Sequence, residues 1–180
     1  MSDTSESTTS DSNTNRRQPF PQGFLDTIGT GWADRTDEIP APRESAPFAA
    51  ARRAALSAQF PGRRLVIPAG GFRQRSNDTD FPFRAHSAFA HLTGWGSDAV
   101  ADSVLVFAPN GDAHDVTLYL RDRATRDTPE FYRDATIGEF WVGPRPSLEA
   151  VAADLGIATD HLENFTPGDE DLVVDEHEGL

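Results

Sequence analysis

The chain has 180 residues, which is room for one ordinary domain with tails, and its formal net charge is -13. An acidic chain without a basic stripe binds nucleic acid poorly, and the absence of cysteine excludes disulfides and thiol catalysis. No apolar run approaches the ~20 residues that a membrane span needs. We therefore expect a cytoplasmic protein whose partners include neither nucleic acid nor a membrane.

The N-terminal residues 1–46 are predicted to be a disordered or irregular extension. Residues 1–18 are mostly Ser, Thr, Asp and Asn, too polar to offset the entropy lost on ordering. Residues 19–46 mix Pro, Gly and scattered aromatics, which is typical of a segment that lies over a surface without regular structure.

The first predicted element is a helix over residues 47–60, with a proline in its first turn and a Pro-Gly pair after its end. Its apolar side chains Phe48, Leu56 and Phe60 fall within about 120° of arc, which predicts the face that packs on the core. Arg52 lies inside the same arc.

Two apolar runs then predict strands, at residues 65–67 and 103–107. The second run has no polar face, so it is expected to be covered on both sides. A turn at residues 109–111 and apolar alternation over residues 116–120 predict a β-hairpin with a longer loop.

The last predicted element is a helix that begins after Ser147 as N-cap and ends at Gly156. Residues 167–180 are predicted to be an acidic disordered tail, because only residues 172–174 are apolar there, too few for a useful sheet edge. Residues 47–166 are thus expected to form an α/β unit with a mixed β-sheet and flanking helices.

The most unusual stretch is Arg-Ser-Asn-Asp-Thr-Asp-Phe-Pro-Phe-Arg at residues 75–84. Its carboxylates could accept hydrogen bonds from the amides of their own turn, and its arginines could grip a carboxylate. Alternatively an internal ion pair locks the turn and directs Phe81 and Phe83 into the core. The structural reading is favoured over a catalytic one, because no further acid or imidazole lies close in sequence. The candidate residues of this motif are Arg75, Asp78, Asp80, Phe83 and Arg84.

No catalytic, cofactor-binding or metal-ligating residue is predicted. His86 and His91 are five residues apart, which is not the spacing of a helical zinc pair. The sequence also has no G-x-S-x-G elbow and no glycine-rich phosphate loop. Trp141, which precedes a Gly-Pro break, is either a core residue or a possible subunit contact, since tryptophan is enriched at interface hot spots.

The motif at residues 75–84, followed by Ser-Ala-Phe at 87–89 and Leu-Thr-Gly-Trp at 92–95, resembles the N-terminal domain of Xaa-Pro aminopeptidases (aminopeptidase P). In that family R-S-x-D-x-[DE]-[YF]-P-[YF]-R leads into S-x-F-x-x-L-T-G. The likeness runs from about residue 52 to residue 165. It implies a ribonuclease-H-like (creatinase/aminopeptidase P N-terminal domain) topology, expected here to be truncated.

The resemblance implies that the whole enzyme is a manganese-dependent peptidase that removes an N-terminal residue preceding proline. Two metal ions activate a hydroxide there, and their ligands lie on a C-terminal pita-bread domain, so none is carried over to this chain. In the family the N-terminal domain shapes the cleft entrance and builds oligomer contacts, and Trp141 lies on a segment similar to one such contact.

Two hypotheses follow. The chain is the non-catalytic N-terminal domain of such an aminopeptidase and is inactive alone, or it is a stand-alone interaction module related to the N-terminal domain of prolidases and aminopeptidases. The expected partners are a second copy of the chain or a full-length aminopeptidase, with proline-containing peptides as the family substrate. Whether the family member is an aminopeptidase or a dipeptidase stays open, as does whether the chain is a fragment.

Overall fold

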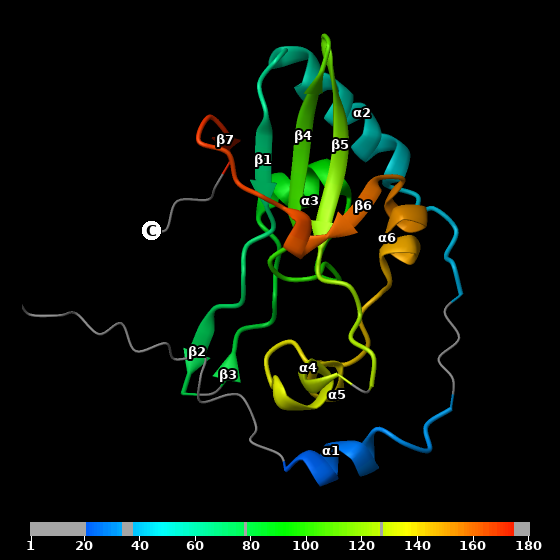
Figure 1. Cartoon of the computed structure of the whole chain (residues 1–180). Helices are drawn as coiled ribbons and strands as arrows, with labels where there is room; N and C mark the ends of the chain where they lie inside the picture. Colours follow the sequence, from blue (N-terminus) through cyan, green and yellow to red (C-terminus); the bar gives the residue numbers. More distant parts are fainter. Residues whose placement is uncertain (1–20, 34–37, 78, 127, 175–180) are drawn as a thin grey trace, which may run out of the picture. The chain divides into compact units, whose positions relative to one another are not determined.

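The computed structural model describes residues 21–33, 38–77, 79–126 and 128–174. The described residues fall into two compact units (Figure 1). The larger unit lies within residues 35–123 and 145–180, and the smaller unit lies within residues 1–34 and 124–144.

The larger unit is built on a five-stranded sheet in the order β6-β5-β4-β1-β7. β1 pairs antiparallel with β4, and β4 pairs antiparallel with β5, while β7 runs parallel to β1 and β6 runs parallel to β5. The predicted mixed sheet with flanking helices is therefore confirmed. The strands are β1 (Leu65–Pro68), β4 (Val104–Asn110), β5 (Ala113–Leu120), β6 (Ala158–His161) and β7 (Leu172–Val173).

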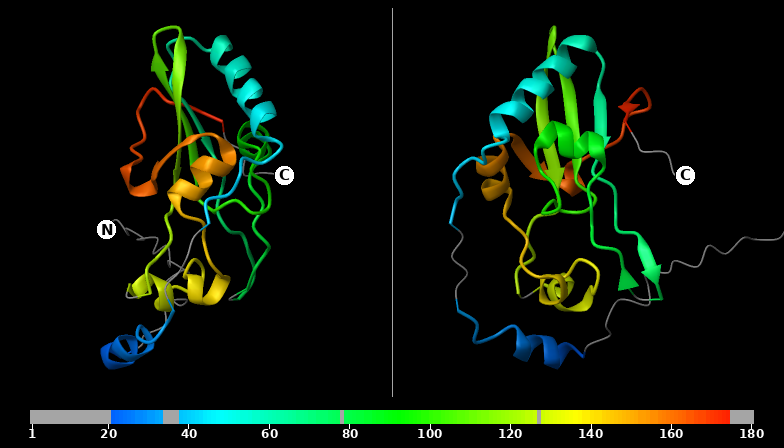
Figure 2. Two further views of the ribbon diagram at one scale, coloured as in Figure 1. Left: turned by 90° about the vertical axis from the view of Figure 1, so that its right-hand side faces the viewer. Right: turned by 180° about the vertical axis from the view of Figure 1, so that it is seen from behind.

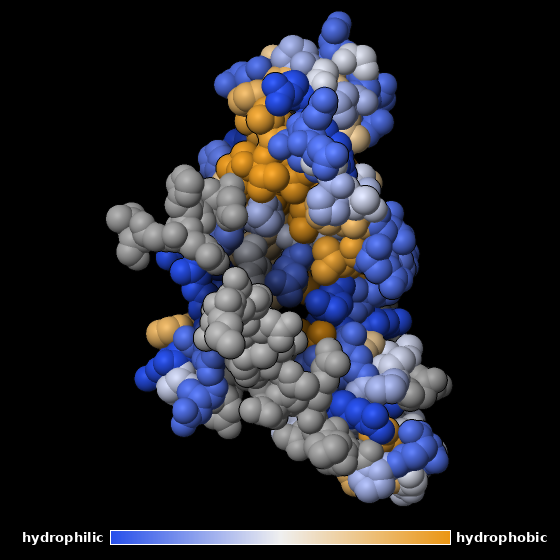
Figure 3. Space-filling view, turned by 60° about the vertical axis from the view of Figure 1, so that its left-hand side comes forward, coloured by the Kyte–Doolittle hydropathy of each residue, from blue (hydrophilic) through white to orange (hydrophobic). Residues whose placement is uncertain are grey.

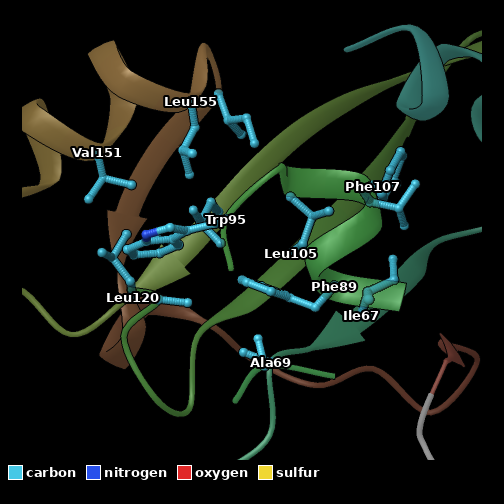
Figure 4. Close-up of a cluster of buried hydrophobic side chains, with 14 of the residues drawn as sticks. Ile67, Ala69, Phe89, Trp95, Leu105, Phe107, Leu120, Val151 and Leu155 are labelled. Carbon is cyan, nitrogen blue, oxygen red and sulfur yellow. The ribbon is translucent and has the colours of Figure 1, made fainter. Parts of the chain in front are cut away.

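Three helices flank this sheet: α2 (Ala46–Gln59), α3 (Ser87–Thr93) and α6 (Leu148–Leu155). Figure 2 shows α2 and α3 on one side of the sheet. The core forms where side chains of α3 and α6 meet alternate residues of the strands (Figure 4). Its large members include Ile67, Phe89, Trp95, Leu105, Phe107, Leu120, Val151 and Leu155.

β4 is buried on both faces, as its unbroken Val-Leu-Val-Phe run predicts. Leu105 and Phe107 point into the main core, whereas Val104 and Val106 belong to a second cluster with the segment of η2 (Leu162–Asn164) and Phe165. The hairpin that follows is tighter than expected. Asn110 pairs with Ala113, so the connection is a two-residue turn, and the positive φ of Gly111 (62°) permits it.

α6 begins and ends as predicted. The hydroxyl of Ser147 accepts a hydrogen bond from the amide of Ala150, and Gly156 adopts the left-handed conformation at the C-cap. In α2 the predicted face is partly wrong, because Phe48 is 67% exposed. Arg53 is buried instead, and its guanidinium donates to the carbonyls of Leu92 and Gly156. A buried arginine is tolerated here because carbonyls at two helix ends satisfy its donors.

The prediction of no sheet edge near the C-terminus is wrong for residues 172–173. The amide of Leu172 donates to the carbonyl of Arg64, and the amide of Val174 donates to that of Val66. The prediction considered only apolar residues, whereas this strand is anchored by an ion pair. Nη1 of Arg64 lies 2.8–2.9 Å from the carboxylate oxygens of Asp171, whose side chain is 6% exposed. This pair holds β7 against β1 although β7 is short.

Replacing Asp171 with asparagine is expected to loosen β7, because the charge-assisted bonds from Arg64 are lost. Hydrogen exchange at the amide of Val174 should become about tenfold faster, while exchange at Leu105 in the centre of the sheet keeps its rate. NMR exchange measurements on both chains would decide this. Equal rates at Val174 in the two chains would show that the ion pair does not hold the strand.

In the smaller unit the described residues form three short helices: α1 (Gln22–Ile28), α4 (Pro129–Arg133) and α5 (Glu139–Val142). A tight turn joins α4 to α5. The carboxylate of Asp134 accepts hydrogen bonds from the amides of Thr136 and Ile137. A Cβ on Gly138 would lie 2.4 Å from the carbonyl oxygen of Asp134 and 2.5 Å from that of Glu130, so only glycine fits this approach.

α1 corrects the prediction that residues 19–46 lack regular structure, since residues 22–28 are helical. The segment has a helical spacing that its Pro and Gly content conceals: Leu25 and Ile28 are three apart and are its half-buried apolar residues. Residues 1–20 and 175–180 of the two predicted tails lie outside the described residues. Within the described part of the chain, every helix is too short or too polar to cross a membrane.

Candidate functional site

The motif at residues 75–84 starts as a small hairpin of β2 (Gln74–Ser76) and β3 (Thr79–Asp80). The two strands pair antiparallel, with Gln74 opposite Asp80, and Asn77 turns the chain at a positive φ of 38°. Arg75 is exposed and Asp80 is half-buried, whereas Asp78 lies outside the described residues. The hairpin is part of the larger unit.

The two phenylalanines of the motif behave differently. Phe83 is half-buried and packs on the main core, and its ring centroid lies 5.6 Å from that of Phe72. Phe81 is 53% exposed, so the expectation that both rings point into the core is wrong for Phe81. In a pleated strand residues 81 and 83 would face the same side, so alternation does not explain the difference. Residues 81–86 belong to no strand and Pro82 lies between the two rings, so the chain here is not held to a pleated register.

The same segment lines a pocket of about 310 Å³ in the larger unit. Phe83 and Arg84 contribute to it, whereas Arg75 and Asp80 do not. Its wall combines two arginines, aromatic rings and one histidine, a surface suited to a planar or negatively charged group. The lining residues are Gly71, Arg73, Phe81, Pro82, Phe83, Arg84, Ala85, His86 and Ser87.

Trp141 lies on α5 in the smaller unit and is 44% exposed, so it is not a core residue of this unit. Phe140 and Val142 beside it are 46% and 52% exposed. Together these three residues form the Trp141 surface. The indole Nε1 of Trp141 donates to the carbonyl of Tyr132 over 2.8 Å, which fixes the ring while leaving much of it open to solvent.

Tyr132 was not among the predicted residues, although it links the elements of the smaller unit. Its side chain is fully buried, with 2% of the residue exposed, and its hydroxyl donates to the carbonyl of Ile28 in α1 over 3.1 Å. Burial raises the pKa of Tyr132 above its usual value. A tyrosine inside a short polar segment gives no sequence signal for such a role.

The histidines that the structure describes do not gather in one site. His114 contacts the hydroxyl of Ser57 through Nδ1 over 2.8 Å and the carbonyl of Arg63 through Nε2 over 2.7 Å, so it joins β5 to α2 and to the loop that follows. Among the described residues, no three His, Asp or Glu side chains are placed to hold a metal ion together. The residues of this part of the chain therefore do not fit a manganese site.

Hydrophobic side chains also gather on one face of the larger unit (Figure 3). The exposed large apolar residues of this unit include Phe48, Phe72, Phe81, Val173 and Val174. Exposed apolar side chains are common on protein surfaces and do not by themselves indicate a site.

The comparisons with known proteins agree with this fold. Residues 49–169 match the family model of the aminopeptidase P N-terminal domain. Xaa-Pro aminopeptidase 1 of Streptomyces coelicolor is 47% identical over 134 residues, which cover 74% of this chain and 26% of that protein. Xaa-Pro aminopeptidase 2 of the same organism is 47% identical over 129 residues, 71% of this chain and 27% of that protein.

A solved structure supports the same assignment. The low-pH form of aminopeptidase P from E. coli superposes with a TM-score of 0.51 at 27% identity, covering 73% of this chain and 24% of that chain. The chain spans about a quarter of the length of the curated relatives that it matches. Because the family model matches well over half of the chain, the chain belongs to the family of the aminopeptidase P N-terminal domain.

Proposed function

We propose that this chain is the non-catalytic N-terminal domain of a manganese-dependent Xaa-Pro aminopeptidase, an enzyme that releases an N-terminal residue preceding proline from a peptide. The observation that carries the proposal is the match of residues 49–169 to that domain, together with relatives named Xaa-Pro aminopeptidase at 47% identity. A cytoplasmic location is part of the same proposal. The manganese ions and the peptide-bond chemistry belong to the remaining length of the enzyme.

In this proposal the domain has two roles, and each rests on a surface described above. The pocket with Phe83 and Arg84 shapes the entrance of the cleft, where exposed arginines would meet negatively charged parts of a peptide. The Trp141 surface builds contacts between subunits, because it exposes two aromatic rings and a valine side by side. Self-association through this surface is the assembly expected of this proposal.

The purified chain is expected not to hydrolyse Xaa-Pro peptides, with or without added manganese. The described residues do not fit a manganese site, so the metal that would activate water has no ligands in this part of the chain. Release of the N-terminal residue from an Xaa-Pro-containing peptide would be followed by chromatography at several manganese concentrations. A mock purification from the same host gives the background of contaminating peptidase. Metal-dependent turnover that follows the chain through purification and exceeds that background would overturn the prediction.

A stand-alone interaction module is the second candidate, and β7 is the observation that favours it. Residues of the chain itself add this strand beside β1, and Arg64 and Asp171 hold it there. Mixing the chain with a full-length Xaa-Pro aminopeptidase and separating the products by size-exclusion chromatography distinguishes the two. A stable mixed oligomer supports the module. Assembly among copies of the chain alone, with no mixed species, supports the domain of a larger enzyme.

A further inference from the structure

We propose that residues 22–33 form an N-terminal strap that positions the Trp141 surface through Tyr132. The inference rests on the proposed function, because it explains how the Trp141 surface, the proposed subunit contact, is held in one arrangement. The strap lies outside residues 49–169, which match the family model. Three sets of contacts within the smaller unit carry the argument.

The first set is the packing of α1. Leu25, Ile28 and Gly29 are half-buried, whereas the other residues of the helix are exposed. The carbonyl of Arg126 packs at ordinary van der Waals distance beside Gly29, since a Cβ there would lie 3.5 Å from its oxygen. The helix thus has one inner face, formed by positions three and four apart, that packs within the smaller unit.

The second set closes the C-terminal end of the strap. The guanidinium of Arg126 lies 4.7 Å from the ring centroid of Trp32, a cation–π contact, and Nη1 of Arg126 donates to the carbonyl of Ala33 over 2.9 Å. The indole of Trp32 in turn donates to the carbonyl of Ile28 over 2.5 Å. Arg126 therefore holds the residues that follow α1 by its charge and by a hydrogen bond.

The third set connects the strap to the Trp141 surface. The carbonyl of Ile28, in the last turn of α1, also accepts the hydroxyl of Tyr132. The carbonyl of Tyr132 accepts the indole of Trp141, and the rings of Tyr132 and Phe140 are 5.7 Å apart. Tyr132 is thus hydrogen-bonded to the strap through its hydroxyl and to Trp141 through its carbonyl.

A short helix such as α5 has little stability of its own, because four residues close few hydrogen bonds for the entropy that they lose. The orientation of Trp141 must then come from tertiary contacts, and its indole N–H is hydrogen-bonded to the carbonyl of Tyr132. A strap that fixes Tyr132 keeps the Trp141 surface in one arrangement, which lowers the entropy cost of association. Tyr132 and the strap act through Trp141 and are positioning elements.

The test introduces charges on the inner face of α1 in order to detach the strap. It then measures how fast the indole N–H of Trp141 exchanges with solvent in the isolated chain at low concentration. The double substitution Leu25→Asp/Ile28→Asp places charges on the half-buried face. The matched control Gly23→Asp/Thr27→Asp adds the same charge on exposed positions, where a Cβ on Gly23 meets no atom within 4 Å. The three tryptophans give three indole N–H signals in a ¹⁵N-labelled chain. The Trp32 signal shows whether the strap has detached, and the Trp95 signal shows whether the core of the larger unit is intact. The Trp141 signal shows whether the Trp141 surface has become more mobile.

We expect the Trp141 indole N–H to exchange with solvent about tenfold faster or more in the inner-face variant, with Trp95 unchanged and the control variant like the parent. A shifted Trp32 signal with an unchanged Trp141 exchange rate would overturn the inference. Tyr132→Phe is the second variant, since it removes only the hydroxyl and keeps the ring and the carbonyl. Unchanged Trp141 exchange in that variant would overturn the inference even if the inner-face variant failed to fold.

This measurement is independent of assembly. If the strap positions Trp141 but the chain shows no assembly of any kind, the inference stands and the proposed contact role fails. If assembly through Trp141 is found but its indole is insensitive to the strap, the proposed function stands and the inference fails.

Discussion

Replacing Trp141 with alanine is expected to weaken assembly at least about 30-fold, which corresponds to about 2 kcal/mol, the lower bound for an interface hot spot. The free energy of unfolding should fall by only about 1–2 kcal/mol, because much of the ring already faces solvent in the isolated chain. This loss of stability comes from the part of the ring that is covered and from its hydrogen bond to the carbonyl of Tyr132. Sedimentation velocity across a dilution series and thermal unfolding give the two quantities.

Trp95 is the matched control for this experiment. It is 2% exposed, and its ring centroid lies 6.5 Å from that of Phe89 in the main core (Figure 4). Trp95→Ala is expected to cost about 3–5 kcal/mol of unfolding free energy, the scale for truncating a buried tryptophan. If Trp141→Ala instead lowered the melting temperature as severely as Trp95→Ala and left the oligomer intact, the contact role of Trp141 would be wrong.

The strands β1, β4 and β5 of the larger unit could be predicted from the sequence because their signals are local. The Val-Leu-Val-Phe run of β4 has no polar face, and α6 has both a serine N-cap and a glycine C-cap. Burial and capping of this kind depend on residues that are neighbours in sequence. The hairpin was also predicted, but its turn was predicted in the wrong place. Pro109 and Asn110 are typical turn residues, yet in the structure they continue β4 and pair with β5.

The elements that sequence reasoning missed depend on contacts between distant residues. β7 is held by Arg64, 107 positions from Asp171, and an apolar count cannot detect an ion pair. α1 is stabilised by Tyr132, 104 positions from Ile28, so its own composition gave no indication of order. The positions of Trp141 and Tyr132 follow from the same long-range contacts, which explains why Trp141 could be read from the sequence as core or contact alike.

Replacing Arg43 with methionine is expected to lower the free energy of unfolding of the larger unit by about 2–3 kcal/mol, somewhat less than the loss of one partner of a fully buried ion pair. The guanidinium donates to the carboxylate of Asp154 through Nε and Nη2, to the carboxylate of Asp98 over 3.0 Å and to the carbonyl of Gly94 over 3.1 Å. One side chain thus joins the segment before α2 to the end of α3 and to α6.

Methionine keeps most of the length of the arginine stem but leaves the carboxylate of Asp154 and the carbonyl of Gly94 without that donor. The hydrogen bond to Asp154 raises the pKa of Arg43, so the arginine stays charged throughout the accessible pH range. Arg43→Lys is the control: it retains the charge but not the planar fork, and it is expected to recover only part of the loss. Chemical denaturation at pH 7 measures all three chains.

The difference between the parent and Arg43→Met should narrow as the pH falls towards about 3, near the usual range of aspartate. Burial pushes the pKa of Asp98 up, but the hydrogen bond and charge of Arg43 bring it below its usual value. A carboxylate with a lowered folded-state pKa stabilises the fold above its unfolded pKa, and this contribution is lost as the pH drops through the folded value. Since the side chain of Asp98 is 61% exposed, the expected narrowing is small. A difference in unfolding free energy that stayed constant from pH 7 to about 3 would show that the ion pair between Arg43 and Asp98 does not stabilise the fold.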